Sequence, residues 1–562
     1  MTRAQGEAMK LRKSLIAATA ITALGVSALA GCSSGGGDDA NNGDSPALTI
    51  AKPDGAITAE SNNPYVGDSS ASKYGYGKVI FESLGLVNQT GDRGVTPWLA
   101  ESIEWNDDYT AVTVVPRKDV TWSDGEPFTA DDIVYTYELV STPALDTAGL
   151  KFEGAEVDGD AVTLTFGESK YVNQARVLHV PIVPKHIWEN LDEPATDPVK
   201  GDDLVGTGPY ELSNWSTESV TLAARDDYWG GDLAVPELHY VSYGDNTALT
   251  TALAQGEADW AQAFIPQVQE QFIDADPEHN VFWAAPTTGS ATLFMNLQQK
   301  PFDDPAFRQA LAWVIDRDAY VDIAREGASE AVWSVTGLSS ILDDEIQPEF
   351  QGKEYKVDAE KARAVLTDAG YTWKDDALVD PDGTPVSFTL SVPSGWSDWN
   401  TAQELIAEDV NEAIGAEVKI DMPDWGGWQG PRDDGTFSAI IHWLEDSGTA
   451  YGLYTSTMDP RWISPEGIAG FNFGRFDDPT ATAALNSYAN ASSDEERTTA
   501  LDTLQTIFSE QVPAIPLGAH PLLGEFNTRN YVGWPSDKDP YASADPTQQN
   551  IVQILTKLKP AE

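Results

Sequence analysis

The sequence predicts an α/β protein with more than one domain, and three observations lead to this fold class. The chain has 562 residues, of which 41% are hydrophobic, and this is long enough for two or three separate cores. After residue 47, segments with helical spacing of apolar residues alternate with short runs of β-forming residues. Aromatic residues make up 10% of the chain, with 18 Trp, which argues against disorder and for packed cores plus aromatic surfaces.

The expected strands are short and rich in β-forming residues. They cover residues 47–51, 110–116, 162–166, 219–223, 387–392, 418–422 and 438–443. Several of them follow a helical segment directly, and this helix–strand alternation is typical of layered α/β domains.

The expected helices are marked by apolar stripes and by end signals. One opens at Thr129, a suitable N-cap with Asp131 and Asp132 in the first turn. Gly370 and Gly415 stand where two others end. These two helices are 358–369 and 401–414, and further helical segments are 305–325 and 494–510.

The N-terminus has the pattern of a secretion signal. A basic stretch at 9–13 precedes an uncharged, apolar segment at 14–30, which ends in Leu-Ala-Gly before Cys32. This ending resembles a bacterial lipobox, in which the Cys is lipidated and becomes the new N-terminus. We therefore expect a signal peptide at 1–31, a Gly/Ser/Asp-rich tether at 32–46, and a lipid anchor on Cys32 at the outer face of the cell membrane.

Charge and metal-ligating residues exclude several classes of function. Lys and Arg number 34 against 89 Asp and Glu, a formal net charge of -55, so nucleic acid is a poor partner. With Cys32 as the only cysteine, neither an internal disulfide nor a cysteine-based zinc cluster is expected. The six histidines show no metal-binding spacing, and we expect no cofactor and no metal.

Several long motifs follow one another along the chain. They occupy residues 97–102 with Trp105, 118–135, 206–210 with 227–231, 253–260, and 301–305 with 308–311 and 315–317. In this order they resemble the extracellular solute-binding proteins of ABC importers called family 5, the peptide, nickel and oligosaccharide group. Because many of these motifs are turn signals, such as Trp-Ser-Asp-Gly at 122–125, we expect them to shape the fold rather than contact the ligand.

The resemblance implies a periplasmic-binding-protein type II fold (cluster C) with two α/β lobes and an extra inserted subdomain. Lobe I would comprise 47–85, 206–292 and 516–562, the inserted subdomain 86–205, and lobe II 293–515. It also implies a monomer that binds a small molecule and delivers it to the transmembrane permease subunits of an importer.

The ligand class rests on finer resemblances. Residues 392–399 (VPSGWSDW), 448–454 and 532–541 are similar to segments of the cellobiose and β-oligosaccharide binders. Peptide binders place an Asp-Tyr pair in the stretch that corresponds to 443–451, and this chain lacks the pair, although Asp446 is an alternative. An oligosaccharide, β-linked and cellobiose-like, is therefore expected, with an oligopeptide or dipeptide as the alternative.

Candidate ligand-binding residues follow from the flat apolar faces and hydroxyl rims of sugars. Indole and phenol rings suit the faces, and amides or carboxylates suit the hydroxyls. The candidates are Trp396, Trp399, Trp425, Trp443 and Tyr451 for stacking, and Asp398, Asn296 and Asn62 for hydrogen bonds.

Two other classes were compared with this interpretation. The chain has no Gly-x-Ser-x-Gly, no His-Glu-x-x-His, no phosphate loop and no nucleotide fingerprint, so an enzyme is not expected. A surface sensor or adhesin would lack the importer-family motifs.

Overall fold

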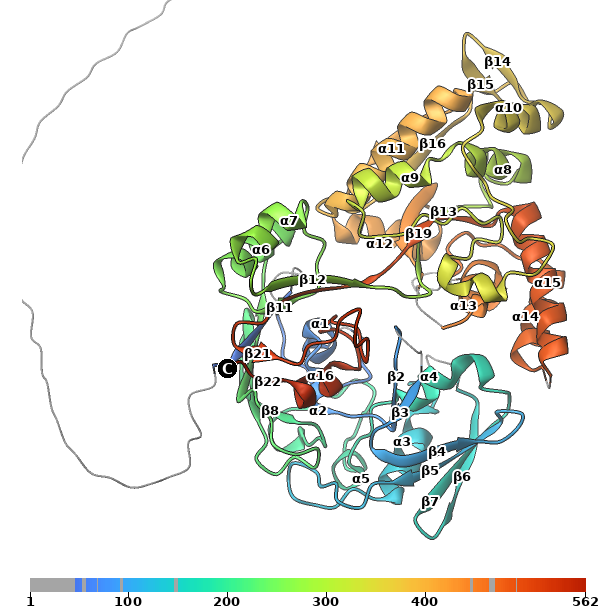
Figure 1. Cartoon of the computed structure of the whole chain (residues 1–562). Coiled ribbons are helices and arrows are strands. Elements are labelled where there is room, and N and C mark those ends of the chain that lie inside the picture. The colour runs from blue at the N-terminus through green and yellow to red at the C-terminus, as the bar shows by residue number, and fades with distance from the viewer. Residues whose placement is uncertain are drawn as a thin grey trace, which may run out of the picture. The chain divides into compact units, whose positions relative to one another are not determined.

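The structure, a computed structural model, describes residues 46–52, 57–67, 69–90, 94–145, 150–444, 448–463, 471–491 and 493–562. The expected signal peptide and the lipidation site Cys32 lie outside these residues, as does nearly all of the expected tether. The described residues form mixed sheets with helices packed against them (Figure 1), which confirms the predicted α/β class.

A seven-stranded sheet gathers strands from both ends and from the middle of the chain. β1 is parallel to β10 and β11, and the other neighbours are antiparallel. Leu48 pairs with Leu238 and Ile50 with Tyr240, and all four side chains are buried on one face, as strand periodicity requires. The strand order is β12 (Asn280–Ala285), β20 (Leu522–Asn527), β11 (Trp260–Ala261), β1 (Leu48–Lys52), β10 (Glu237–Ser242), β9 (Ser219–Ala224), β8 (Tyr210–Trp215).

A five-stranded sheet holds the second core. Its strand β16 is parallel to β17 and β18, and the helix α11 (Ser397–Ile414) connects β16 to β17. Every side chain of β13 is buried, because both faces of this inner strand are covered, and its sequence is accordingly not alternating. The strand order is β17 (Glu417–Asp421), β16 (Ser387–Ser391), β18 (Ala439–Trp443), β13 (Ser290–Met295), β19 (Ala514–Ala519).

A four-stranded antiparallel sheet is covered by the helix α3 (Ala130–Val140). Ile133 and Tyr137 of α3 share a buried cluster with Val112 and Leu164 of the sheet. Thr129 caps α3 as expected and forms a capping box with Asp132. The strand order is β4 (Ala100–Trp105), β5 (Ala111–Pro116), β7 (Ala161–Phe166), β6 (Phe152–Asp158).

The chain passes between the seven- and five-stranded sheets at two places, residues 286–289 and 520–521. The two crossings are bonded to each other, because Thr287 Oγ1 donates to the carbonyl of His520 (2.8 Å) and the His520 amide donates to the carbonyl of Gly289 (2.9 Å). The sheets therefore place the crossings a few residues away from the expected boundaries at 292 and 516. As limits of folding domains, those boundaries remain a prediction.

Further helices and hairpins complete the described chain. The helices are α1 (Ser70–Tyr74), α2 (Gly77–Ile80), α4 (Gln174–Leu178), α5 (Lys185–Trp188), α6 (Asn246–Gln255), α7 (Val268–Gln271), α8 (Pro305–Val314), α9 (Arg317–Ala319), α10 (Ala359–Asp368), α12 (Trp425–Asp434), α13 (Ala450–Met458), α14 (Pro479–Ala489), α15 (Asp494–Gln511) and α16 (Ile551–Lys557). The strand pairs are β2 (Gly85–Val87) with β3 (Val95–Pro97), β14 (Thr372–Lys374) with β15 (Ala377–Val379), and β21 (Tyr531–Val532) with β22 (Lys559–Pro560).

Two expected helices differ from the structure. The expected helix 305–325 is divided, because Ile315 has extended backbone angles and Asp316 starts α9 as an N-cap. A π-helical turn at Tyr320–Ala324 follows α9. The helix expected from residue 401 starts four residues earlier, at Ser397, so that Asp398 and Trp399 lie in a first helical turn rather than in a loop.

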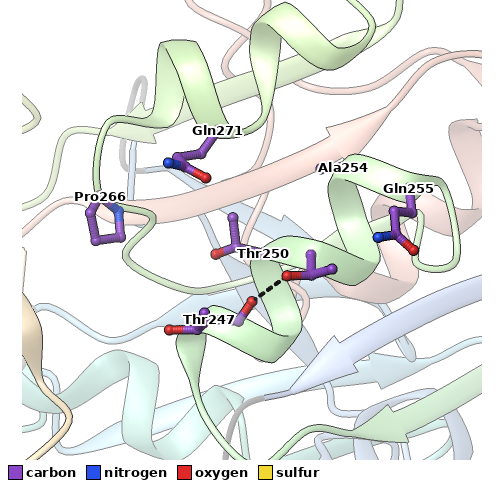
Figure 2. Close-up of a pocket in the computed structure, with 7 residues that line it drawn as sticks. Thr247, Thr250, Ala254, Gln255, Pro266 and Gln271 are labelled. Carbon is purple, nitrogen blue, oxygen red and sulfur yellow. Dashed lines mark hydrogen bonds between the residues drawn. The ribbon is translucent and has the colours of Figure 1, made fainter.

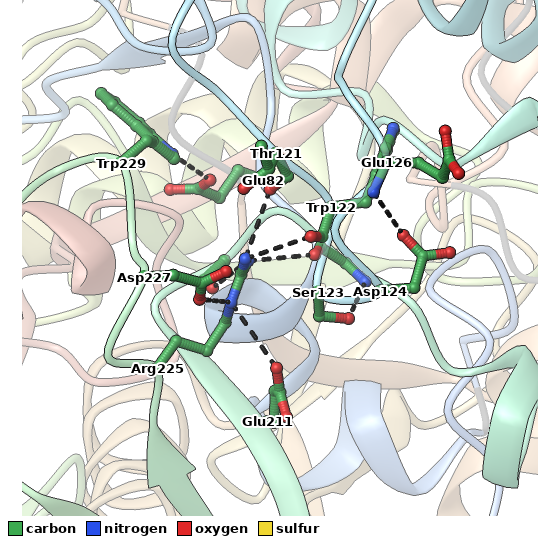
Figure 3. A network of polar contacts seen from close by, with 12 residues as sticks. Glu82, Thr121, Trp122, Ser123, Asp124, Glu126, Glu211, Arg225, Asp227 and Trp229 are labelled. Atoms are coloured by element: carbon green, nitrogen blue, oxygen red, sulfur yellow. Dashed lines mark hydrogen bonds and ion pairs between the residues drawn. The ribbon is translucent and has the colours of Figure 1, made fainter.

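Three of the motif segments, 118–135, 206–210 and 227–231, meet around the buried guanidinium of Arg225 (Figure 3). The guanidinium donates to the carbonyls of Trp122 and Gly206, both at 3.3 Å, and to the carboxylate of Asp227 at 3.1 Å. Nearby, the buried carboxyl of Glu82 accepts a hydrogen bond from the Trp229 indole (Figure 3). It also accepts hydrogen bonds from two further aromatic side chains. Burial raises the pKa of Glu82. These contacts hold loops together, and none of the residues involved lines the cleft described below.

Candidate functional site

One cavity is a hollow of about 310 Å³ beside α6 and α7 (Figure 2). Three threonines and two glutamines line it together with Ala254 and Pro266. The lining contains no charged and no aromatic side chain.

The larger cavity is a cleft of about 910 Å³, within the size range of small-molecule sites. Three parts of the chain line it. Beside the four-stranded sheet these are residues 87–89, Val95, residues 171–176 and His179. The seven-stranded part contributes residues such as Gln262 and Leu522, and the five-stranded part residues such as Trp396 and Trp443. Residues of both crossings, Thr287 and His520, also line it. A ligand in this cleft contacts all three parts.

One wall of the cleft is built from indole rings. Trp396 lies at the start of α11 and its ring centroid is 5.1 Å from that of Trp399 and 5.9 Å from that of Trp443. All three line the cleft. Trp428 is fully buried behind Trp396, at 5.5 Å, and its indole nitrogen donates to the Ser391 carbonyl. The buried ring supports the cleft-facing ring from behind.

Further aromatic residues line another part of the cleft. Tyr451 is buried and stacks on Tyr488 with ring centroids 5.4 Å apart. Trp462 packs against Phe471 at 6.0 Å and lies under the guanidinium of Arg176, whose carbon is 5.0 Å from the ring centroid. Tyr451, Trp462, Phe471 and Arg176 all line the cleft.

Between these aromatic groups the lining is polar but mostly uncharged. It contains side-chain amides and hydroxyls, which both donate and accept hydrogen bonds. The amides are Asn88, Gln89, Asn173, Gln174, Asn246, Gln262 and Gln548, and the hydroxyls belong to Thr287, Thr449, Thr455, Thr547 and Ser456.

The two carboxylates in the described lining are already engaged. Asp398 pairs with the buried guanidinium of Arg325, which also lies 5.1 Å from the ring centroid of Phe264. Burial raises the pKa of Asp398, and the Arg325 charge opposes this shift. Asp545 accepts from the amide and hydroxyl of Thr547, both at 2.7 Å, and from the Gln548 amide at 3.0 Å.

Most of the expected site residues lie together in the structure. Trp396, Asp398, Trp399, Trp443 and Tyr451 all line the cleft. Their contact with a ligand remains a prediction.

Two expected hydrogen-bonding residues lie elsewhere. The Asn296 amide donates to the carbonyls of Gly435 and Phe437, both at 2.9 Å, and Asn62 donates to the Val199 carbonyl and accepts from the Tyr76 hydroxyl. Both asparagines are fully buried and neither lines the cleft, so the structure does not bring them together with the other expected site residues. Trp425 also lies outside the lining, packed on the outer side of Trp396 and exposed.

Several lining residues were missed from the sequence. Arg325, Phe264 and His520 reach the cleft from segments that are far apart along the chain, and Arg176 and Trp462 meet only in the folded protein. No local pattern distinguishes these residues. The Gly-, Pro- and Asp-containing context of Trp396 and Trp399, by contrast, is visible in the sequence.

The described residues were also searched for metal sites and membrane spans. Within that part of the chain no group of three or more His, Cys, Asp or Glu is arranged to hold a metal ion. None of the described helices has the length and apolar character needed to span a bilayer.

Two curated relatives match over long stretches of the chain. Protein XP55 of Streptomyces lividans is 31% identical over 375 residues, which cover 64% of this chain and 65% of that protein, just under two thirds of its length. Di/tripeptide-binding protein 2 of Pseudomonas aeruginosa (strain UCBPP-PA14) is 26% identical over 520 residues, which cover 86% of this chain and 91% of that protein.

Solved structures share the fold. A periplasmic oligopeptide-binding protein of an oligopeptide ABC transporter from Thermotoga maritima, bound to mannohexaose, has a TM-score of 0.77 and 24% identity, covering 93% of this chain and 100% of that chain. The oligopeptide-binding protein AppA from Bacillus subtilis, in complex with a nonapeptide, has a TM-score of 0.73 and 20% identity over 92% and 99% of the two chains.

The family assignment rests on the middle of the chain. Residues 94–464 match the family described as bacterial extracellular solute-binding proteins, family 5 Middle. This confirms the resemblance in the motifs and, with the structural neighbours, the two-lobed binding-protein fold. The family is a class of binding proteins rather than of enzymes. The chain therefore belongs to the family 5 bacterial extracellular solute-binding proteins and is a substrate-binding component of an ABC importer.

Proposed function

We propose that the protein captures an oligosaccharide, β-linked and two to a few units long, in the large cleft. The protein acts as a monomer, is held at the outer face of the cell membrane by a lipid on Cys32, and presents this ligand to the permease subunits of its importer. The observation that carries the ligand class is the combination of indole rings with a mostly uncharged, amide-rich and hydroxyl-rich lining.

The ring wall suits sugar faces. Trp396 and Trp443 are partly exposed and line the cleft, so their faces offer flat apolar surfaces of the kind that pyranose C–H groups pack against. The amides and hydroxyls around them match the donors and acceptors on the rim of a sugar ring.

The charges favour a sugar over a peptide. The α-ammonium of a peptide needs a free carboxylate when it is taken out of water. Asp398 is paired with Arg325, and Asp545 already accepts hydrogen bonds from Thr547 and Gln548, so both carboxylates of the described lining have partners within the protein. Asp446, the alternative partner for a peptide, lies outside the described residues.

A peptide is the second candidate, and the names of relatives favour it. Di/tripeptide-binding protein 2 is similar over 86% of this chain, and AppA, with the same fold, holds a nonapeptide. The neighbour from Thermotoga maritima holds mannohexaose. The fold thus accommodates both ligand classes, and the lining of the cleft has to decide between them.

Titration calorimetry on the wild-type protein tests the proposal. The probes are cello-, xylo- and mannooligosaccharides of two to six units, and peptides of two to five residues. Micromolar or tighter binding of an oligosaccharide is expected. Peptide binding of that strength without any sugar binding would assign the protein to the second candidate.

A further inference from the structure

Arg176 differs from the other cationic side chains in and around the cleft. It lies in the last turn of α4, is partly exposed and lines the cleft. Within the described part of the chain its guanidinium lies over the face of Trp462, at 5.0 Å, and forms no ion pair. By contrast, Arg325 is paired with Asp398, and Arg497 is paired with Asp494 at 3.0 Å.

No ion pair joins Arg176 to a carboxylate in the described part of the chain, although acidic residues outnumber basic ones by 89 to 34. A guanidinium that stays unpaired in a cleft keeps its hydrogen-bond donors available for a ligand, and the Trp462 ring beneath restricts its orientation. Its planar fork of N–H groups matches the two oxygens of a carboxylate.

The two carboxylates of the described lining are bound within the protein. Asp398 is paired with Arg325, and Asp545 accepts hydrogen bonds from Thr547 and Gln548. Neither is paired with Arg176, and the overall negative charge of the protein acts on Arg176 only weakly, because charges farther than about 8–10 Å are largely screened at physiological salt. The guanidinium of Arg176 is therefore available to a carboxylate of the ligand.

We propose that Arg176 binds a carboxylate of the ligand, and that the oligosaccharide is an acidic one that contains a uronic acid unit. This rests on the proposed function, since the sugar class comes from the aromatic lining. A peptide C-terminus carries the same carboxylate chemistry, and the experiment separates the two sources.

The test compares matched ligands on matched variants. Cellobiouronic acid has a carboxylate in place of one hydroxymethyl group of cellobiose. Tripeptides with a free C-terminus have a carboxylate in place of the carboxamide of the amidated peptides. The variants are Arg176→Gln and, as a control, Arg363→Gln. Arg363 also lies over an indole, 5.1 Å from the Trp373 ring centroid, but outside the cleft. Both variants remove one positive charge from a side chain that is not buried, so both are expected to fold.

The expected result is that the wild type and Arg363→Gln bind cellobiouronic acid about 10- to 100-fold more tightly than cellobiose. Arg176→Gln is expected to bind both sugars equally. If sugars bind but the acid-to-neutral ratio is the same in Arg176→Gln, the role of Arg176 is wrong and the proposed function stands. If only peptides bind and Arg176→Gln abolishes the preference for the free carboxylate, carboxylate recognition stands and the sugar class is wrong. Failure of all four probes to bind the wild type contradicts both.

Discussion

The indole of Trp396 packs against that of Trp425, with ring centroids 5.5 Å apart, yet only Trp396 lines the cleft. The two residues are close in space and identical in chemistry, and they differ in which side of the cluster they occupy. This pair therefore separates a ligand contact from a general effect of losing a tryptophan.

Replacing Trp396 with Ala is expected to weaken oligosaccharide binding about 5- to 150-fold, which corresponds to about 1–3 kcal/mol for a lost stacking surface. Trp425→Ala, with 46% of its side chain exposed, is expected to change the affinity less than threefold. Calorimetry with the oligosaccharide that binds the wild type measures both. Equal losses in the two variants would contradict the placement of Trp396 at the ligand.

Asn296 is expected to affect stability rather than binding. Its amide satisfies the carbonyls of Gly435 and Phe437, so Asn296→Ala leaves two buried acceptors without a donor. We expect the free energy of unfolding to fall by about 1–3 kcal/mol, measured by urea denaturation. The dissociation constant of the folded variant should match that of the wild type. A large loss of affinity with normal stability would restore Asn296 to the binding site.

Arg225 is expected to be among the most sensitive positions for folding. Its buried guanidinium donates to backbone carbonyls of two loops, and Arg225→Ala would remove all of these bonds together with the ion pair to Asp227. The expected cost is about 3–5 kcal/mol of unfolding free energy. Arg529, an exposed arginine paired with Asp276, is the control, and its replacement by Ala should cost about 0–1 kcal/mol. Similar losses for both would show that the buried network adds little.

His442 is expected to stay neutral well below neutral pH. Its ring is buried against Trp428, Nδ1–H donates to the Trp443 carbonyl at 2.6 Å, and Nε2 accepts from Arg432 at 3.1 Å. Burial lowers the pKa of His442 to about 3. In the unfolded chain a histidine has a pKa of about 6.5, so between pH 6.5 and about 3 the unfolded state binds a proton that the native state does not.

This group therefore lowers the free energy of unfolding as the pH falls through that range, by about 1–2 kcal/mol at pH 5. Nitrogen chemical shifts of the labelled ring should show the Nδ1–H tautomer unchanged from pH 7 to pH 5. Between these two pH values the wild type should lose more stability than His442→Gln. A ring that titrates with a midpoint near 6.5 would rule out the buried neutral state.

Replacing Cys32 with Ala is expected to remove the membrane anchor. The Leu-Ala-Gly-Cys sequence predicts that lipidation and cleavage both depend on this thiol. The variant should be released to the medium or accumulate as an unprocessed precursor, as seen by membrane fractionation and intact mass. Detergent-dependent retention of a processed form would show that another group anchors the protein.

Much of the fold could be predicted because its determinants are local. The Thr129 cap and the ends at Gly370 and Gly415, both with positive φ, follow from residues next to one another in the sequence. The division of the helix 305–325 was missed because its apolar stripe continues across Ile315, where the backbone is extended. Asp316 then caps a new helix. Because many other aspartates in the sequence do not cap a helix, the residue type alone does not indicate this role.

The site could be predicted only in part, for a related reason. Trp396 and Trp399 stand in a Gly-, Pro- and Asp-containing segment that indicates a binding surface, and both line one cleft together with Trp443. Asparagine gives no such indication, because the same amide serves equally well to satisfy buried carbonyls, as at Asn62 and Asn296. The binding role proposed for Arg176 could not be predicted either, because it depends on contact with Trp462, nearly three hundred residues away, and on the lack of a paired acid.

The bonded pair of crossings at Thr287 and His520 has a mechanical consequence. Points on the axis of a rotation travel least, so any swing of one sheet about these two crossings leaves their atoms almost stationary. Both residues also line the cleft. Groups near the pivot can hold a newly arrived ligand before the swing begins, whereas residues at the far wall, such as Trp462, engage at its end. Substitutions at the pivot would then alter the rate of capture, and substitutions at the far wall the time for which the ligand is retained.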